Sequence, residues 1–413
     1  MPFRFIHTAD LHLDSPLKSL ALRDAGLSAL IGTATRTALE RIVDLCLAEA
    51  VDALLIAGDL YDGATTSMKT AGFLLAQMRR LEVAGVRVFL IRGNHDAEAR
   101  ITRELVFPGN VTLFGPKVGC QLIEQGGLTV ALHGISFQQP HAPASLLPLF
   151  QPPLRGAVNI GMMHTSLNGA AGHDPYAPVS VAELQASGFD YWALGHIHQR
   201  AVHTGACLVV MPGMPQGRDI GEMGSKSVTL VTIADDGTLT AQERPTSVAD
   251  FARVTVDVGG IADWRDLVEV LRAAVLAARQ TQTAPHLVLR PVLSGASPLA
   301  WRIARDGDLL LTEAAEAALA TGSVWIDKLE RDVLPAAATG GGALADLADL
   351  IAAAPAAGLV LEADTVMDDL RKALPRDLRG LLGDTPETMA ALRDGLMRDG
   401  AAGVLARLTA GEG

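Results

Sequence analysis

Asp10-Leu11-His12, which follows the strand-like segment 3–8, is the first of four short motifs that decide the fold of this chain. The others are Gly58-Asp59, Gly93-Asn94-His95-Asp96 and Gly195-His196-Ile197-His198, and a single further histidine, His164, lies between the last two. Together they offer carboxylate, amide and imidazole groups but no thiolate. Such a set suits two hard to intermediate divalent cations held side by side. Paired metal ions are typical of hydrolysis at phosphorus.

Each motif stands where an apolar run ends. These runs are residues 51–57, 86–91, 160–163 and 191–194, each followed directly by a motif. Continuous apolar runs of this length predict buried strands, and the stretches 33–50 and 67–84 between them predict helices. Ligands of open α/β folds bind at the carboxyl ends of the strands. We therefore expect the strand ends to meet in one site.

The spacing inside the motifs predicts how their side chains lie. Asp10 and His12 are two residues apart, so an extended backbone would direct both side chains to one face and bury Leu11 behind them. His196 and His198 repeat this spacing. A lone Asp-x-His or Gly-Asp motif is common and carries little weight by itself. All the motifs together, in this order and at strand ends, require a common explanation.

Asp59 and Asn94 complete the expected donor groups. Asp59 follows a glycine, which permits a sharp turn off the strand, and its two oxygens can bridge two ions. Asn94 offers a neutral carbonyl oxygen, and His164 adds an imidazole. Basic residues near the motifs are considered for contacts with backbone phosphates, namely Arg100, Arg200, Arg218 and Lys226.

The composition predicts a globular protein inside the cell. A chain of 413 residues with 49% hydrophobic and 19% charged residues can form two or three domains with a sizeable core. No apolar run approaches a membrane span, and the N-terminus has no signal-peptide pattern, so we expect a cytoplasmic protein. The three cysteines lie far apart, as buried residues of a reducing compartment do. The net charge of −12 weakens the simplest nucleic-acid signature, but two cations would bring positive charge to the site itself.

Three regions follow one another along the chain. Alternating strand-like and helical patterns, followed by short strands over 208–233, predict a catalytic domain over residues 1–245. A polar stretch at 234–250 indicates a boundary. A strand, an amphipathic helix and a second strand then predict a small α+β domain over residues 246–335, which would cap the site and bind DNA.

The last region, residues 336–413, is predicted to be a linker and a helical interaction region. Residues 336–343 contain three consecutive glycines and have the composition of a flexible linker. The acidic, helical tail after it either docks a protein or packs against its own chain.

The order Asp-x-His, Gly-Asp, Gly-Asn-His-Asp, His, Gly-His-x-His resembles that of the calcineurin-like metallophosphoesterases. Within this family the chain looks like the DNA-repair exonuclease branch, the bacterial SbcD and YhaO-type proteins, over residues 1–330. The stretches 7–14, 57–62, 190–198 and 212–218 carry this resemblance. It implies an α/β fold, a four-layer metallophosphoesterase β-sandwich flanked by helices, with a small α+β capping domain and a helical C-terminal tail.

The resemblance also implies a role for each site residue. One metal ion would take Asp10, His12, Asp59 and His198 as ligands, and the other Asp59, Asn94, His164 and His196. His95 is the catalytic histidine of the family, and manganese is its usual metal. Asp62 stands where archaeal and eukaryotic relatives carry a histidine, so it is assigned only a supporting role, like Asp14. Asp96 either orients the His95 ring or caps the following turn.

The function that the resemblance implies is that of a manganese-dependent DNA exo/endonuclease subunit. It would hydrolyse phosphodiester bonds by two-metal catalysis in DNA repair or DNA end processing. Its expected partners are DNA and an SMC-like coiled-coil ATPase subunit, and it would form a homodimer away from membranes.

Two other functions compete with the nuclease. One is a phosphomonoesterase of the same fold, acting on proteins or nucleotides. Protein phosphatases of this family usually show Gly-Asp-x-x-Asp-Arg-Gly and a final Glu in the third motif, whereas Asp62 is followed by Gly63-Ala64 and the third motif ends in Asp96. The other is a non-catalytic scaffold, which is disfavoured because every expected ligand position is filled.

Overall fold

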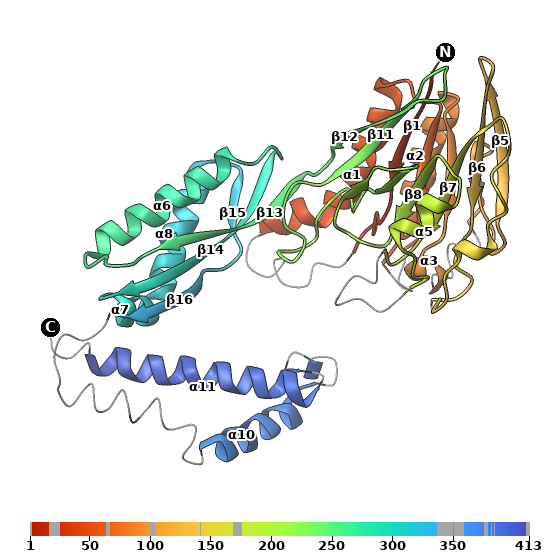
Figure 1. Cartoon of the computed structure of the whole chain (residues 1–413). Coiled ribbons are helices and arrows are strands. Elements are labelled where there is room, and N and C mark those ends of the chain that lie inside the picture. Colours follow the sequence, from red (N-terminus) through yellow and green to blue (C-terminus); the bar gives the residue numbers. More distant parts are fainter. Residues whose placement is uncertain are drawn as a thin grey trace. The chain divides into compact units, whose positions relative to one another are not determined.

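The structure, a computed structural model, describes residues 2–15, 25–62, 67–98, 105–140, 142–167, 176–336, 350, 359–375, 379–380, 382–383 and 385–409. It divides into two compact units. One is formed by Met1–Ala252 with Gln282–Val288, and the other by Arg253–Thr281 with Leu289–Gly413. Figure 1 labels the elements of both.

The first unit contains two six-stranded sheets. In one, β1 (Phe3–Thr8), β2 (Ala53–Ala57), β3 (Arg87–Ile91) and β4 (Val111–Leu113) are parallel, and the antiparallel strands β11 (Ser227–Ile233) and β12 (Leu239–Pro245) extend it beyond β1. The other has the order β5-β6-β7-β8-β10-β9. Its strands β6 (Leu128–Gly134), β7 (Val158–His164), β8 (Tyr191–Gly195) and β10 (Leu208–Met211) are parallel, and β5 (Gly119–Gln125) and β9 (Ala201–His203) are antiparallel edges.

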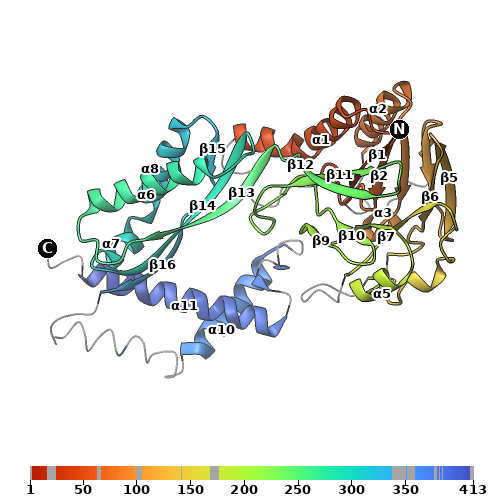
Figure 2. The ribbon, with the colours of Figure 1, turned by 45° about the horizontal axis from the view of Figure 1, so that its top comes forward.

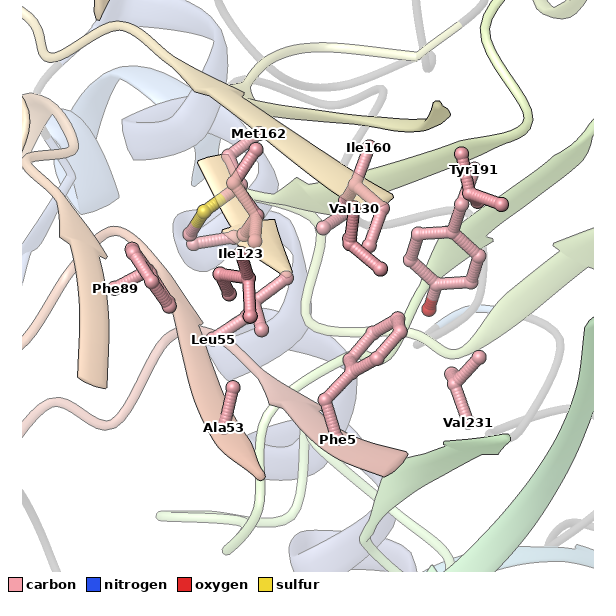
Figure 3. Close-up of a cluster of buried hydrophobic side chains, with 14 of the residues drawn as sticks. Phe5, Ala53, Leu55, Phe89, Ile123, Val130, Ile160, Met162, Tyr191 and Val231 are labelled. Atoms are coloured by element: carbon pink, nitrogen blue, oxygen red, sulfur yellow. The ribbon is translucent and has the colours of Figure 1, made fainter. Parts of the chain in front are cut away.

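The main core lies between the two sheets. Figure 3 shows Phe5, Leu55 and Phe89 of the first sheet directed toward Ile160 and Tyr191 of the second. All five are buried. Each side chain of this size contributes about 1.5–3 kcal/mol when it is removed from water, so this layer holds the two sheets face to face.

Helices cover the outer face of each sheet. On the first sheet, α1 (Ala25–Ala48) and α2 (Met68–Val83) bury Leu39 and Leu74 against Ile6 of β1. On the second, α5 (Val181–Ala186) buries Leu184 against Trp192. Figure 2 shows these helices on opposite sides of the paired sheets. The four layers are therefore helix, sheet, sheet and helix, which confirms the predicted fold class.

The predicted strands and helices before the motifs are present, and most of their ends differ by one or two residues. The exception is α1, which begins at Ala25, eight residues before the predicted start at residue 33. The short helices α3 (Asn94–Glu98) and η2 (Leu147–Leu149) complete the first unit. The polar stretch 234–250 contains a strand that we did not predict, β12. It pairs with β11 along one side only, and most of its side chains are half-buried or exposed, which explains its polar composition.

The second unit is built on a four-stranded sheet. The strands are β13 (Ala249–Asp257), β14 (His286–Ser297), β15 (Val324–Ile326) and β16 (Glu330–Pro335), of which the first two begin in the first unit. The helices α6 (Trp264–Gln280) and α8 (Gly307–Ala320) pack against each other, and α7 (Ala300–Arg305) lies beside β16. Asp263 caps α6 by accepting a hydrogen bond from the backbone of Arg265.

The C-terminal region is helical, as predicted. It contains α10 (Leu359–Ala373) and α11 (Pro386–Thr409), and α11 packs against both α10 and α7. The predicted linker, residues 336–343, lies outside the described residues apart from Ala336. No described helix combines the length and hydropathy of a membrane span.

Candidate metal centre

The parallel strands bring the motifs to one edge of each sheet. Asp10, Asp59 and Asn94 follow the adjacent strands β1, β2 and β3, whereas His164 ends β7 and His196 follows β8. Backbone hydrogen bonds continue beyond the strands, from the Asp10 N–H to the Gly58 carbonyl at 3.0 Å. Across the sheets, the His196 N–H donates to the Asp10 carboxylate at 3.0 Å. These bonds fix the loops that carry the site.

The structure brings six predicted ligands together in two clusters. Their ligand atoms lie within 4.8 Å of one another in each cluster, and the members are Asp10, His12 and His198 in one and Asp59, His164 and His196 in the other. An Asp59 oxygen lies 3.3 Å from Nε2 of His164 and 4.0 Å from Nε2 of His12. Asp59 thus stands between the clusters. The Asn94 amide oxygen lies 3.0 Å from Nε2 of His164, so the seventh predicted ligand is also present.

Hydrogen bonds orient the imidazole rings toward the shared space. Nδ1 of His164 donates to the Ala57 carbonyl at 2.9 Å, and Nδ1 of His198 donates to the Glu222 carboxylate at 2.8 Å. Each bond directs Nε2 into the shared space, where the neutral ring can bind a cation. Nε2 of His12 and Nε2 of His198 lie 3.1 Å apart. Facing ring nitrogens beside buried carboxylates fit a divalent cation between them.

Burial and neighbouring charges shift the pKa values of these groups. Burial lowers the pKa of His12 to about 3, so the ring is neutral, as a metal ligand must be. It raises the pKa of Asp10 to about 6. Burial would lower the pKa of His164, but the Asp59 and Asp10 carboxylates and the Ala57 carbonyl together raise it to about 9. Burial would raise the pKa of Asp59, but the neighbouring histidines, His164 first, hold it below its usual range. The buried carboxylates therefore depend on nearby positive charge.

The backbone around the ligands differs from our expectation of extended segments. Asp10, His12, Asp59 and His196 have φ values of 53°, 41°, 52° and 103°, in the left-handed region that costs non-glycine residues energy. The prediction of strand-like alternation was therefore wrong, because the chain turns sharply as it leaves β1 and β8. Leu11 is nevertheless buried, with an exposed fraction of 1%.

Glycines at the site leave no room for a side chain. A Cβ atom on Gly93 would lie 2.1 Å from an Asp59 carboxylate oxygen. Gly58 has a φ of 95°, and a Cβ there would lie 2.4 Å from Nδ1 of His164. These two glycines are thus required by the packing of the ligands themselves.

His95 lies at the rim of the clusters, with 39% of its side chain exposed. Its ring packs edge-on against His12, and Nδ1 lies 3.4 Å from an Asp62 oxygen. Asp96 is buried at the start of α3, where its carboxylate accepts the backbone N–H of Gly93 at 3.1 Å and of Leu60 at 3.0 Å. These are the bonds of a turn cap, and they also join the loops after β2 and β3. Orientation of the His95 ring falls to Asp62.

Glu222 is a site residue that sequence reasoning did not identify as such. It orients His198, and it also accepts a hydrogen bond from Arg218 at 2.6 Å. Arg218 lies 3.4 Å from the Asp62 carboxylate as well. Arg218 stands in the stretch quoted for the family resemblance and Glu222 just after it, but only their spacing of four residues hinted at a pair. Arg218 is therefore paired with two carboxylates, and its contact with a backbone phosphate stays a prediction.

The remaining candidates have other partners. Asp14, expected to support the site, instead binds Arg36 of α1 through a hydrogen bond of 2.6 Å. Arg200 donates to Thr229 and pairs with Glu243. Arg100 lies outside the described residues. A cavity of about 330 Å³ near Cys46 lies at the opposite ends of β2 and β3 and contains no predicted ligand.

Comparison with known proteins places this geometry in context. Residues 3–200 match the model of the calcineurin-like phosphoesterases, and residues 251–333 that of the middle domain of metallophosphoesterase YhaO. The chain is 33% identical over 297 residues to the uncharacterized metallophosphoesterase YhaO of Bacillus subtilis, covering 71% of this chain and 72% of that one. It is 25% identical over 312 residues to a subunit of the nuclease SbcCD of Escherichia coli, covering 64% and 74%. It is 23% identical over 229 residues to the DNA double-strand break repair protein Mre11 of Sulfurisphaera tokodaii, covering 51% and 54%.

Proposed function

The chain belongs to the calcineurin-like phosphoesterase family, and on this premise we propose that it is a manganese-dependent DNA exo/endonuclease subunit. The observation that carries the proposal is the pair of clusters on either side of Asp59, with His95 exposed at their rim. We propose that the two ions take the ligands that were expected from the sequence, including Asn94. We also keep the division into a catalytic domain (1–245), a capping domain (246–335) and a tail (336–413).

The residues have separate tasks in this reaction. Two divalent cations, when bound, supply Lewis acidity and a nucleophilic hydroxide at neutral pH. His95 is exposed enough to reach the substrate, and it donates a proton or hydrogen bond to the leaving sugar oxygen. Asp62 fixes the His95 ring through Nδ1 and leaves Nε2 for the leaving group. Glu222 and Ala57 set the ring orientations of His198 and His164.

Two observations favour a DNA diester over a phosphate monoester as the substrate. Relatives with 25% and 23% identity are described as a nuclease subunit and a DNA double-strand break repair protein. The arginine that phosphatases carry after the second motif is absent, since Gly63 follows Asp62. The names of the same relatives support DNA and a further subunit as partners. We propose that this subunit is a coiled-coil ATPase and that the complete assembly contains a homodimer of this chain.

The test is hydrolysis of bis(p-nitrophenyl) phosphate and of linear duplex DNA with manganese, by the wild type and by His95→Gln. We expect manganese-dependent activity on both substrates that is lost in the variant, by about 10²-fold or more. The small diester serves because it does not require an ATPase partner. Rapid hydrolysis of p-nitrophenyl phosphate with none of either diester would replace the nuclease by a phosphatase.

A second measurement does not depend on activity. A cation that binds only the folded chain raises its unfolding temperature. We expect manganese to stabilise the wild type and His95→Gln equally, because His95 is not among the proposed ligands. If manganese changed the unfolding temperature of neither protein, a non-catalytic scaffold would become the better interpretation.

A further inference from the structure

We infer that a cavity beside His198 binds the nucleotide next to the scissile bond, with the Lys226 ammonium group contacting its phosphate. The inference rests on the proposed phosphodiester hydrolysis and names the part of the substrate that is recognised. The cavity has a volume of about 160 Å³, and both His198 and Lys226 line it. A group bound there would therefore adjoin the first metal cluster.

Lys226 is the basic group of this cavity that lacks a carboxylate partner among the described residues. Its Nζ donates to the Met223 carbonyl at 2.9 Å. By contrast, Arg200, which also lines the cavity, pairs with Glu243. Burial lowers the pKa of Lys226 despite the opposing effect of Glu222. Asp250 acts in the same direction as Glu222, but neither carboxylate forms an ion pair with Lys226 among the described residues. A partly buried ammonium group without an ion-pair contact gains from an anionic ligand.

The backbone holds Lys226 in place independently of its side chain. Its carbonyl accepts the Thr246 N–H at 2.9 Å, and its own N–H donates to the Ser247 hydroxyl at 3.3 Å. Two further hydrogen bonds, from the Thr246 hydroxyl at 3.4 Å and from the Ser247 N–H at 3.3 Å, also end on the Lys226 carbonyl. A change of the Lys226 side chain therefore removes the charge and leaves the chain path intact.

The other walls of the cavity fit a nucleotide better than a free phosphate ion. Met214 and Pro212 form an apolar side, and Met223 adds a side chain that is 47% exposed. Ser225 and Ser227 are the other polar residues that flank Lys226 in the lining. A phosphate would contact the ammonium group while a sugar or base packs on the methionines. An isolated phosphate would use only the polar part.

The experiment compares Lys226→Gln and Lys226→Arg with the control Lys117→Gln, which removes the same charge from an exposed loop. A fluorescein-labelled oligothymidylate of about twelve nucleotides, a typical length for single-strand sites, is titrated in metal-free buffer at several salt concentrations. One phosphate contact fewer lowers the slope of log K against log salt by about 0.7. We expect Lys226→Gln to show this smaller salt slope and an affinity about threefold to tenfold below that of the wild type. Lys226→Arg and Lys117→Gln should keep the slope and affinity of the wild type.

The kinetic arm uses the manganese-loaded full chain. We expect Lys226→Gln to raise KM for the oligonucleotide more than it changes kcat, and to lower the preference for the oligonucleotide over bis(p-nitrophenyl) phosphate. Thermal unfolding of each variant shows whether it is folded. In a competition assay, thymidine monophosphate should displace the oligonucleotide better than inorganic phosphate does.

Two results would overturn the inference. One is that Lys226→Gln binds the oligonucleotide with the affinity and the salt slope of the wild type. The other is that inorganic phosphate displaces the oligonucleotide as well as thymidine monophosphate does. Failure of the proposed function looks different, since the wild type would then hydrolyse no diester. In that case the binding titration in metal-free buffer would still show whether Lys226 contacts the oligonucleotide.

Discussion

Asp62 and Glu222 are carboxylates whose nearest histidines differ, although Asp62 also lies 3.8 Å from Nδ1 of His12. Asp62 lies 3.4 Å from Nδ1 of His95, and Glu222 lies 2.8 Å from Nδ1 of His198. Because His95 is assigned to the leaving group and His198 to a metal ion, loss of each carboxylate should have a different consequence. The two single variants thus serve as controls for each other.

Asp62→Asn should impair departure of the leaving group. The positioned His95 ring matters little for p-nitrophenolate, which leaves without a proton, and much for a sugar oxygen. We therefore expect kcat for a dinucleotide to fall about tenfold or more, with a smaller fall for bis(p-nitrophenyl) phosphate. Steady-state kinetics on both substrates at saturating manganese measure this. Equal losses on both would mean that Asp62 does not act through His95.

Glu222→Gln should weaken metal binding instead. A residue that orients a ligand histidine typically contributes about 10–100-fold to metal affinity, and the amide also leaves Arg218 with less neutralising charge. Calorimetric titration of the metal-free protein with manganese should show this loss, whereas Asp62→Asn should bind manganese more nearly like the wild type. An unchanged affinity in Glu222→Gln would remove Glu222 from the metal centre.

At the scale of elements, the site depends on how closely the loops after β2 and β3 approach each other. Asp96 at the start of α3 joins them through hydrogen bonds to Leu60 and Gly93. Gly93 itself stands where a Cβ atom would lie 2.1 Å from the Asp59 carboxylate. Neither loop can move without displacing Asp59, which stands between the two clusters.

Gly93→Ala should therefore disrupt the centre while the sheets persist. We expect manganese affinity to fall at least about tenfold, as for other changes that misplace ligands, and the stabilisation by manganese to shrink accordingly. The matched control is Gly72→Ala in α2, where a Cβ atom meets nothing within 4 Å. That change should leave manganese binding intact and stabilise the helix by up to about 1 kcal/mol. Wild-type manganese affinity in Gly93→Ala would contradict this account.

At the scale of the whole molecule, the metal centre and the C-terminal tail belong to different units. Every proposed ligand lies within Met1–Ala252, whereas α10 and α11 belong to the second unit, in which α11 packs against α7. The structure thus shows part of the tail packed on its own chain. Several large apolar side chains on α10 remain exposed, among them Leu361 and Val366, which leaves surface for a partner protein.

Deletion of residues 345–413 should separate these roles. We expect the truncated chain to keep most of its hydrolysis of bis(p-nitrophenyl) phosphate, because it retains every proposed ligand. Binding to the proposed ATPase subunit should be lost, as measured by co-purification of the two proteins. Loss of small-diester hydrolysis in a truncated chain that unfolds cooperatively would show that the tail supports the catalytic unit.

The local patterns of the sequence predicted the strands and helices that carry the motifs, and six of the proposed ligands lie together in the two clusters. Continuous apolar runs predicted the strands that lead to Asp59, Asn94, His164 and His196, because buried parallel strands need such runs. The strand before Asp10 was predicted from the strand-like segment 3–8. Helical periodicity predicted α1, α2 and α6 for a similar reason. The edge strand β12 escaped notice, since it is polar and only half covered.

Only the tertiary structure decided how those residues contact each other. The left-handed backbone at Asp10 and His12 depends on hydrogen bonds to the loop after β2, which no local pattern encodes. The pairs His198–Glu222 and His95–Asp62 join residues 24 and 33 positions apart, and Arg218 meets Asp62 across 156 positions. Spacing along a chain fixes neighbours within a strand or a helix. Which loops meet at a sheet edge, and which charges neutralise each other there, is fixed by the packing of one sheet on the other.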